Sequence, residues 1–138
     1  MYDFIDMDAE FCQTPDIALG KEWLIANGLG GYSSSTIIGC NNRKHHGLLV
    51  SAFKPPTGRR LVLSDLVEIA ETKDKKFPLH SSIKQDGTIE PTGFRRQVNF
   101  RLSPFPVFVY SFGNYEMEKS IFICRNKNTL VVRYRVIS

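Results

Sequence analysis

Cysteine is scarce in this sequence, and the few cysteines show no pairing pattern. The chain has three, Cys12, Cys40 and Cys124, and no two of them form a Cys-x-x-Cys pair. A disulfide framework needs an even set of cysteines, and a zinc ribbon needs paired Cys-x-x-Cys ligands. Both classes are therefore excluded. We expect free thiols in a reducing compartment, which predicts a cytoplasmic protein.

Long apolar runs are also lacking, and we do not expect the first residues to be a signal peptide. No run approaches the roughly 20 residues needed to span a bilayer, and the first six residues, MYDFID, are acidic where a signal peptide is basic and then apolar. Apolar residues make up 42% of the chain and charged residues 23%, which excludes a disordered or low-complexity protein. We predict a soluble protein with no membrane partner, whose 138 residues suit one domain.

The second half of the chain alternates apolar and polar residues with period two, which is typical of strands and not of helices. Gly113-Asn114 separates the alternating runs 105–112 and 115–124. Such a two-residue link is a strong hairpin indicator, because glycine supplies the positive φ that the turn needs. A third run, 129–137, follows another short turn. These runs predict an antiparallel meander.

The first half also lacks a clean helical stripe, although residues 1–19 are ambiguous. We expect further strands at 22–27, 32–38, 47–53, 61–70 and 94–102, and a tight hairpin at Asp86-Gly87. The serine and threonine residues of 32–38 favour a solvated or ligand-facing strand. Roughly seven to nine short strands predict an all-β fold, an antiparallel β-sandwich that spans residues 1–138 as a single domain. A final strand reaching Val136 leaves an exposed sheet edge, which we expect further chain or self-association to cover.

Motifs for nucleophilic, nucleotide or metal chemistry are missing. There is no Gly-x-Ser-x-Gly elbow, and the 28–33 segment lacks the pattern and the following helix of a nucleotide-binding loop, so its glycines are expected to serve a turn. Asp65 and Glu68, three residues apart on an expected strand, would face opposite ways and make no acid/base pair. His45 and His46, as strand neighbours, would also face opposite ways. We predict no catalytic residue, no metal site and no cofactor in this chain.

Acidic residues are absent from 39–60, which holds five bases. Such a tract attracts polyanions, but no DNA- or RNA-binding motif accompanies it, so we predict no nucleic-acid partner. Its most unusual part is Asn41-Asn42-Arg43-Lys44-His45-His46-Gly47. These side chains suit sugar hydroxyls and carboxylates. A solvated basic turn has the same composition, and the residues alone leave both interpretations open.

Several segments, taken in order, resemble a known family. They are EWLIANGLGGYSSST at 22–36, NRKHHGLLV at 42–50, KPP at 54–56, FRLSPFP at 100–106 and EKSIF at 118–122. The N-terminal domain of bacterial and archaeal glycogen debranching enzymes has the pattern E-W-L-x-x-N-G-L-G-G-Y-x-S-x-T, followed by N-x-R-[RK]-Y-H-G-L-L-V. The resemblance extends from about residue 20 to the end of the chain.

This resemblance implies a β-supersandwich domain that precedes an (α/α)6-barrel with amylo-α-1,6-glucosidase activity. The catalytic carboxylates would lie in that barrel, outside this chain, and the family's N-terminal domain is longer than the segment present. The partners implied are the enzyme's own catalytic domain and an α-glucan. The residues implied to face the barrel and its glucan site are Asn42, Arg43, Lys44, His45, His46 and Gly47, with Trp23, Asn27 and Tyr32 as secondary candidates. His45 stands where the family usually has tyrosine.

An alternative is a free-standing carbohydrate-binding β-sandwich. Trp23 or Tyr32 would then form a sugar platform on the surface. Against this, a tryptophan is usually well buried, which favours a core position for Trp23.

Overall fold

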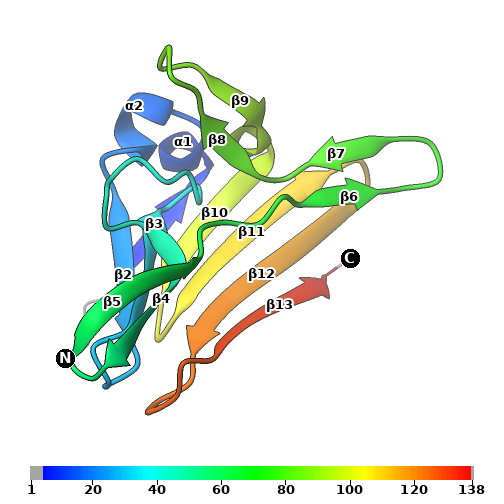
Figure 1. Ribbon diagram of the computed structural model, residues 1–138. Helices are drawn as coiled ribbons and strands as arrows, with labels where there is room; N and C mark the ends of the chain where they lie inside the picture. The colour runs from blue at the N-terminus through cyan, green and yellow to red at the C-terminus, as the bar shows by residue number, and fades with distance from the viewer. Residues whose placement is uncertain (1–4, 138) are drawn as a thin grey trace.

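The computed structural model describes residues 5–137, and strands dominate them. About 53% of the described residues are in strands and 9% in helices, and the sheets are antiparallel, which confirms the predicted all-β class. Two short helices, α1 (Ala9–Cys12) and α2 (Pro15–Ala18), lie in the N-terminal region that the sequence left ambiguous. Helix α1 packs against the strand β10 (Gln97–Leu102) and α2 against α1, at one end of the molecule (Figure 1).

The larger sheet has five antiparallel strands in the order β1-β10-β11-β12-β13. Its other members are β1 (Ile5–Asp8), β11 (Pro106–Phe112), β12 (Tyr115–Ile123) and β13 (Leu130–Val136). The last three form the predicted meander, and the Gly-Asn turn pairs Phe112 with Tyr115. Figure 1 shows β10 to β13 side by side; among the residues described, β13 pairs with β12 alone.

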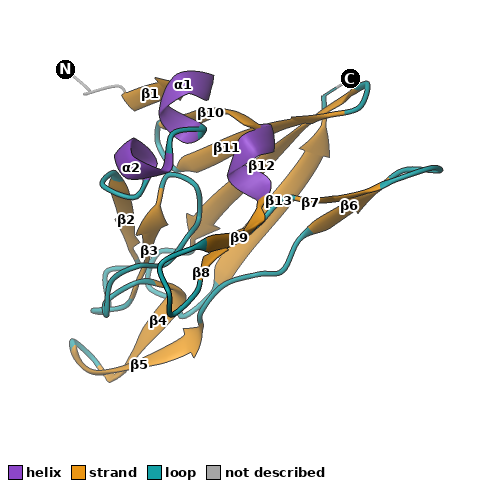
Figure 2. Ribbon diagram, turned by 90° about the horizontal axis from the view of Figure 1, so that it is seen from above, coloured by secondary structure: helices purple, strands orange, loops and turns teal. Residues whose placement is uncertain are grey.

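A second sheet has four strands in the order β2-β3-β4-β5. Its members are β2 (Glu22–Ala26), β3 (Tyr32–Thr36), β4 (Gly47–Lys54) and β5 (Thr57–Leu63). Two smaller hairpins pair β6 (Ile69–Glu71) with β7 (Lys76–Pro78), and β8 (Ser81–Ile83) with β9 (Ile89–Thr92). A short 3-10 helix, η1 (Gly93–Arg96), occupies the start of the strand expected at 94–102. Seen from above, the β6–β7 hairpin extends away from both larger sheets (Figure 2).

Aromatic side chains from both larger sheets form the core. Phe100, Phe108 and Tyr110 are each at most 1% exposed. The Trp23 ring from β2 meets Phe108 edge-on, with the ring centroids 6.3 Å apart. Trp23 Nε1 donates to the carbonyl of Thr36 at 2.9 Å, so its polar atom is satisfied inside the core. Each such large side chain contributes about 1.5–3 kcal/mol by leaving water. This packing of one sheet on the other makes the predicted sandwich.

The serine-rich strand β3 is buried, so the expectation of a solvated or ligand-facing strand is wrong. Ser34, Ser35 and Thr36 are each at most 1% exposed. The hydroxyl of Ser34 donates to the carbonyl of Trp23 at 2.7 Å, and that of Thr36 to the carbonyl of Cys40 at 2.9 Å. Hydroxyl groups that bond to nearby backbone lie in a core without the cost of an unpaired polar atom.

The strand expected at 61–70 is interrupted after Leu63, where β5 ends and a loop begins. Asp65 and Glu68 were expected on opposite faces of that strand, but both line one cavity of about 20 Å³. A cavity of this size accommodates about one water molecule and no sugar. Glu68 Oε1 lies 2.8 Å from the Nζ of buried Lys119, a residue 51 positions away. This ion pair fastens the loop to β12, and no local pattern predicts it.

Candidate functional site

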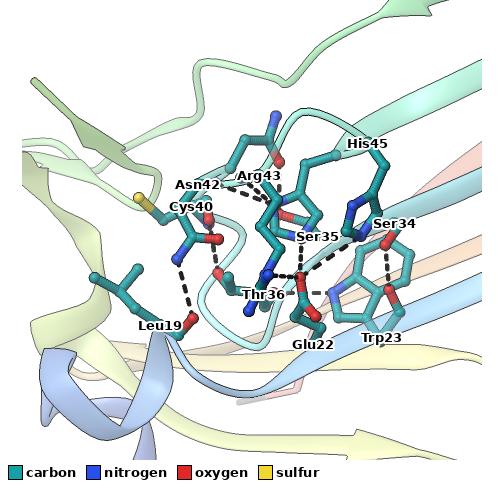
Figure 3. Close-up of polar contacts among 12 residues, drawn as sticks. Leu19, Glu22, Trp23, Ser34, Ser35, Thr36, Cys40, Asn42, Arg43 and His45 are labelled. Atoms are coloured by element: carbon teal, nitrogen blue, oxygen red, sulfur yellow. Dashed lines mark hydrogen bonds and ion pairs between the residues drawn. The ribbon is translucent and has the colours of Figure 1, made fainter. Parts of the chain in front are cut away.

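The stretch singled out by its composition forms a turn between β3 and β4, next to the end of α2 (Figure 3). His45 and His46 lie in this turn and not on a strand, so the expectation that they face opposite ways is wrong. Both imidazoles approach the same oxygen, Oε1 of Glu22 at the start of β2. The turn therefore folds over Glu22.

His46 is the buried centre of the turn, and its side chain has no exposed surface. Its Nδ1 accepts hydrogen bonds from the backbone N–H groups of Asn42 at 3.0 Å and Arg43 at 3.1 Å. A nitrogen that accepts two hydrogen bonds carries no proton, so the neutral ring has its proton on Nε2. That nitrogen donates to Glu22 Oε1 at 2.6 Å. Burial lowers the pKa of His46 more than the neighbouring Glu22 carboxylate raises it, which preserves the neutral form.

Glu22 also holds the exposed side of the turn. Arg43 Nε lies 3.0 Å from Glu22 Oε1, and His45 Nε2 lies 3.6 Å from the same oxygen. The side chains of Arg43 and His45 are nevertheless 60% and 48% exposed, and Lys44 between them is exposed as well. One carboxylate thus fixes a turn whose cationic ends remain open to a ligand.

Further hydrogen bonds fasten both ends of the turn to the sandwich. Asn41 Oδ1 accepts from the Ser35 hydroxyl at 2.7 Å, and its Nδ2 donates to the carbonyl of Ser64 at 3.0 Å. Asn42 Nδ2 donates to the carbonyl of Leu19 at 3.0 Å, beside α2. These bonds hold the backbone of the turn in place before any partner binds, which lowers the entropy cost of binding.

Gly47, at the end of the turn, is buried, and a Cβ there would collide with Leu61. The candidate set therefore divides into an exposed group, Asn42, Arg43, Lys44 and His45, and a buried group, His46 and Gly47.

Glu22, His45 and His46 each offer one possible ligand atom, and these three atoms lie within 4.8 Å of one another, which is a spacing that a metal site could have. A metal on His46 would need the lone pair of Nε2. The ring proton would then move to Nδ1, against the two backbone N–H groups that point at that nitrogen. The Arg43 guanidinium also competes for the same Glu22 oxygen. The donor set therefore favours a hydrogen-bonded cluster over a metal centre.

The secondary candidates Trp23, Tyr32 and Asn27 all make hydrogen bonds within the fold. Trp23 is 3% exposed, so it forms no surface platform for a sugar, and the core position favoured by its size is confirmed. Tyr32 is half-buried, and its hydroxyl donates to the carbonyl of His45 at 2.8 Å, which supports the turn from the side.

Asn27 is fully buried and joins two turns. Its Oδ1 accepts from the backbone N–H groups of Leu29 and Gly31, and its Nδ2 donates to the carbonyl of Lys127 and to Asn128 Oδ1. All of its hydrogen-bonding capacity is used within the fold, so it has none left for a ligand.

Glu22 is the residue that sequence reasoning missed. It heads the EWL segment and is the acid that the cationic turn folds onto, but it lies 24 positions from His46. A tract of five bases without an acid favours the approach of an acid from elsewhere in the chain; the tract does not identify which one.

The fold and the turn together define an antiparallel β-sandwich domain with an exposed basic turn between β3 and β4. A family model described as "Glycogen debranching enzyme N terminal" matches residues 21–138. The chain belongs to this family, which confirms the resemblance seen in its motifs. No curated protein and no solved structure matched the chain. Across residues 5–137, the structure has no helix with the length and apolar character needed to cross a membrane.

Proposed function

We propose that this chain is the non-catalytic part of an enzyme with amylo-α-1,6-glucosidase activity. In this proposal it packs on the enzyme's catalytic barrel through the turn at 42–47 and helps to shape the α-glucan site. Family membership supports the link to glycogen debranching. A cytoplasmic location belongs to the same proposal, because the chain's cysteines are unpaired.

The observation that carries the proposal is that hydrogen bonds fix the backbone of the turn while its basic side chains stay exposed. Glu22 and His46 fix the backbone of the turn, while Arg43, Lys44 and His45 extend into solvent. Guanidinium and ammonium groups donate several hydrogen bonds each, to carboxylates of a partner surface or to sugar hydroxyls. Side-chain hydrogen bonds from Asn41, Asn42 and His46 thus hold the turn in one conformation.

The test is the substitution Arg43→Ala in the full-length enzyme. A hydrogen bond from a charged group contributes about 1.5–3 kcal/mol when it is desolvated. Each 1.4 kcal/mol is about a factor of ten, so we expect kcat/KM for an α-1,6-branched substrate to fall by about tenfold or more. Because Arg43 is largely exposed in this domain, the stability of the domain should change little.

Arg133→Ala is the matched control, because it removes the same charge from an exposed position on β13. Its kcat/KM should stay within about twofold of the parent enzyme. If the Arg43→Ala variant and the parent enzyme have equal activity, the turn is not part of the glucan site.

A further inference from the structure

An exposed aromatic surface lies away from the cationic turn. Tyr115 begins β12 directly after the Gly-Asn turn and is 47% exposed. Its ring packs on Phe112 with the centroids 6.1 Å apart, and Phe112 packs on Phe77 at 5.3 Å. Phe77 lies on β7, so this stack joins the β6–β7 hairpin to the β11–β12 hairpin. The stack supports the Tyr115 ring from behind and leaves part of it open.

Two hollows adjoin the Tyr115 ring. One, of about 410 Å³, lies between the 72–75 turn and the Gly113-Asn114 turn, and the other, of about 480 Å³, lies toward Met117 and Val136. Tyr115, Thr72 and Lys73 line both hollows. Each volume falls within the range of about 300–1,000 Å³ found for small-molecule sites.

The two hollows differ in chemistry. The first is bordered mainly by polar groups, among them Thr72, Asp74 and Asn114, which supply both donors and acceptors. The second is bordered mainly by apolar groups, including Met117 and Val136. The Tyr115 ring thus lies between a polar hollow and an apolar hollow.

We propose that Tyr115 is the stacking platform of a second glucan-binding site, with the 72–75 turn and Asn114 binding sugar hydroxyls. A pyranose ring has an apolar face of C–H groups and a rim of hydroxyl groups. The face packs on the electron-rich face of a tyrosine ring, and the rim reaches the polar groups beside it. The choice of a glucan rests on the proposed function.

An apolar peptide accounts for this surface less well. It would fill the hollow toward Met117 and Val136, but it would leave Asp74 and Asn114 without new partners. A sugar chain that runs across Tyr115 uses both hollows. The β6–β7 hairpin extends on the side of the molecule away from α2, which lies next to the turn at 42–47 (Figure 1). The two surfaces are therefore separate.

The test measures binding of maltoheptaose to the 138-residue chain by calorimetric titration, and retardation of the chain in a gel that contains glycogen. We expect Tyr115→Ala to weaken binding by at least about tenfold and Tyr115→Phe, which keeps the ring, to bind within about twofold of the parent chain. Phe53→Ala is the control, because Phe53 is 60% exposed on β4, outside both hollows; it should bind like the parent chain.

Asp74→Ala provides a second measurement that does not depend on the folding of the Tyr115→Ala variant, because Asp74 lies in an exposed turn. It should weaken binding severalfold. The inference is overturned if the parent chain fails to bind maltoheptaose at about 10 mM, or if Tyr115→Ala and Asp74→Ala both bind it normally. Neither result bears on the kinetics of Arg43→Ala, so the second site and the proposed function fail independently.

Discussion

Two adjacent histidines have different structural roles, and replacing each of them by alanine should separate those roles. His46→Ala removes the acceptor used by two partly buried backbone N–H groups, those of Asn42 and Arg43. It also removes the donor to Glu22, although Glu22 retains its contact with Arg43 and is partly exposed. His45→Ala removes one 3.6 Å contact from a side chain that is 48% exposed.

The expected magnitudes follow from these contacts. A buried donor that loses its partner costs about 1–3 kcal/mol. Water entering the space left by the imidazole satisfies part of the loss at the two N–H groups, so we expect His46→Ala to cost about 2–4 kcal/mol. That is a large part of the about 5–15 kcal/mol by which a domain is stable. His45→Ala should cost less than about 0.5 kcal/mol, because surface contacts of this kind contribute little.

Urea denaturation of the 138-residue chain measures both values. His46→Ala should lower the midpoint without changing the slope, and His45→Ala should leave the midpoint in place. His46→Gln should recover part of the loss, because a glutamine amide also offers an acceptor and a donor. Similar losses for His45→Ala and His46→Ala would refute the assignment of His46 as the buried support of the turn.

Two further predictions concern pH and the glycine turn. Because burial lowers the pKa of native His46 below its usual 6.5, the unfolded chain takes up the proton first as the pH falls. Stability should therefore decline as the pH falls from about 6.5 through the native pKa of His46. Over this pH range the urea midpoint should fall less in His46→Gln than in the parent chain. An equal fall of the urea midpoint in both proteins would contradict the prediction. Gly30→Ala should cost at least about 2 kcal/mol, since Gly30 has a φ of 95° and a Cβ there would collide with the Pro56 carbonyl. Gly39→Ala is the control, with a φ of 70° and no atom within 4 Å of the added Cβ; equal thermal shifts of the two variants would show that contact with Pro56 contributes nothing.

The meander of β11, β12 and β13 was predictable from the sequence because each strand pairs with the next one along the chain. Period-two alternation and a Gly-Asn link are local features, and they determine both the strands and the hairpin between them. The larger sheet also includes β1, which comes from the start of the described chain and pairs with β10. Local patterns do not specify such pairings.

The break in 61–70 shows what local patterns miss. The sequence LVLSDLVEIA has the composition of a strand, but Glu68 leaves the sheet to pair with Lys119. A buried lysine is uncommon, and its partner is far away in the sequence. The burial of β3 escaped prediction for a related reason, because the hydroxyl groups of Ser34 and Thr36 bond to backbone carbonyls whose positions depend on the folded chain.

The composition of the sequence indicated the stretch that forms the candidate site, but it did not predict the geometry of that stretch. The sequence identified the basic stretch at 41–47, and the structure divides it into exposed and buried residues. The strand rule failed for His45 and His46 because they lie in a turn, where neighbouring side chains need not alternate. Glu22 became recognisable only when β2 was seen to lie beneath that turn.

The most direct measurement is a crystal structure of the full-length enzyme with a bound α-glucan oligosaccharide. Our account predicts that at least one of Arg43, Lys44 and His45 lies within about 3.5 Å of a polar atom of the catalytic barrel or of the sugar. A turn surrounded by solvent on the side away from the barrel, with the glucan elsewhere, would contradict it.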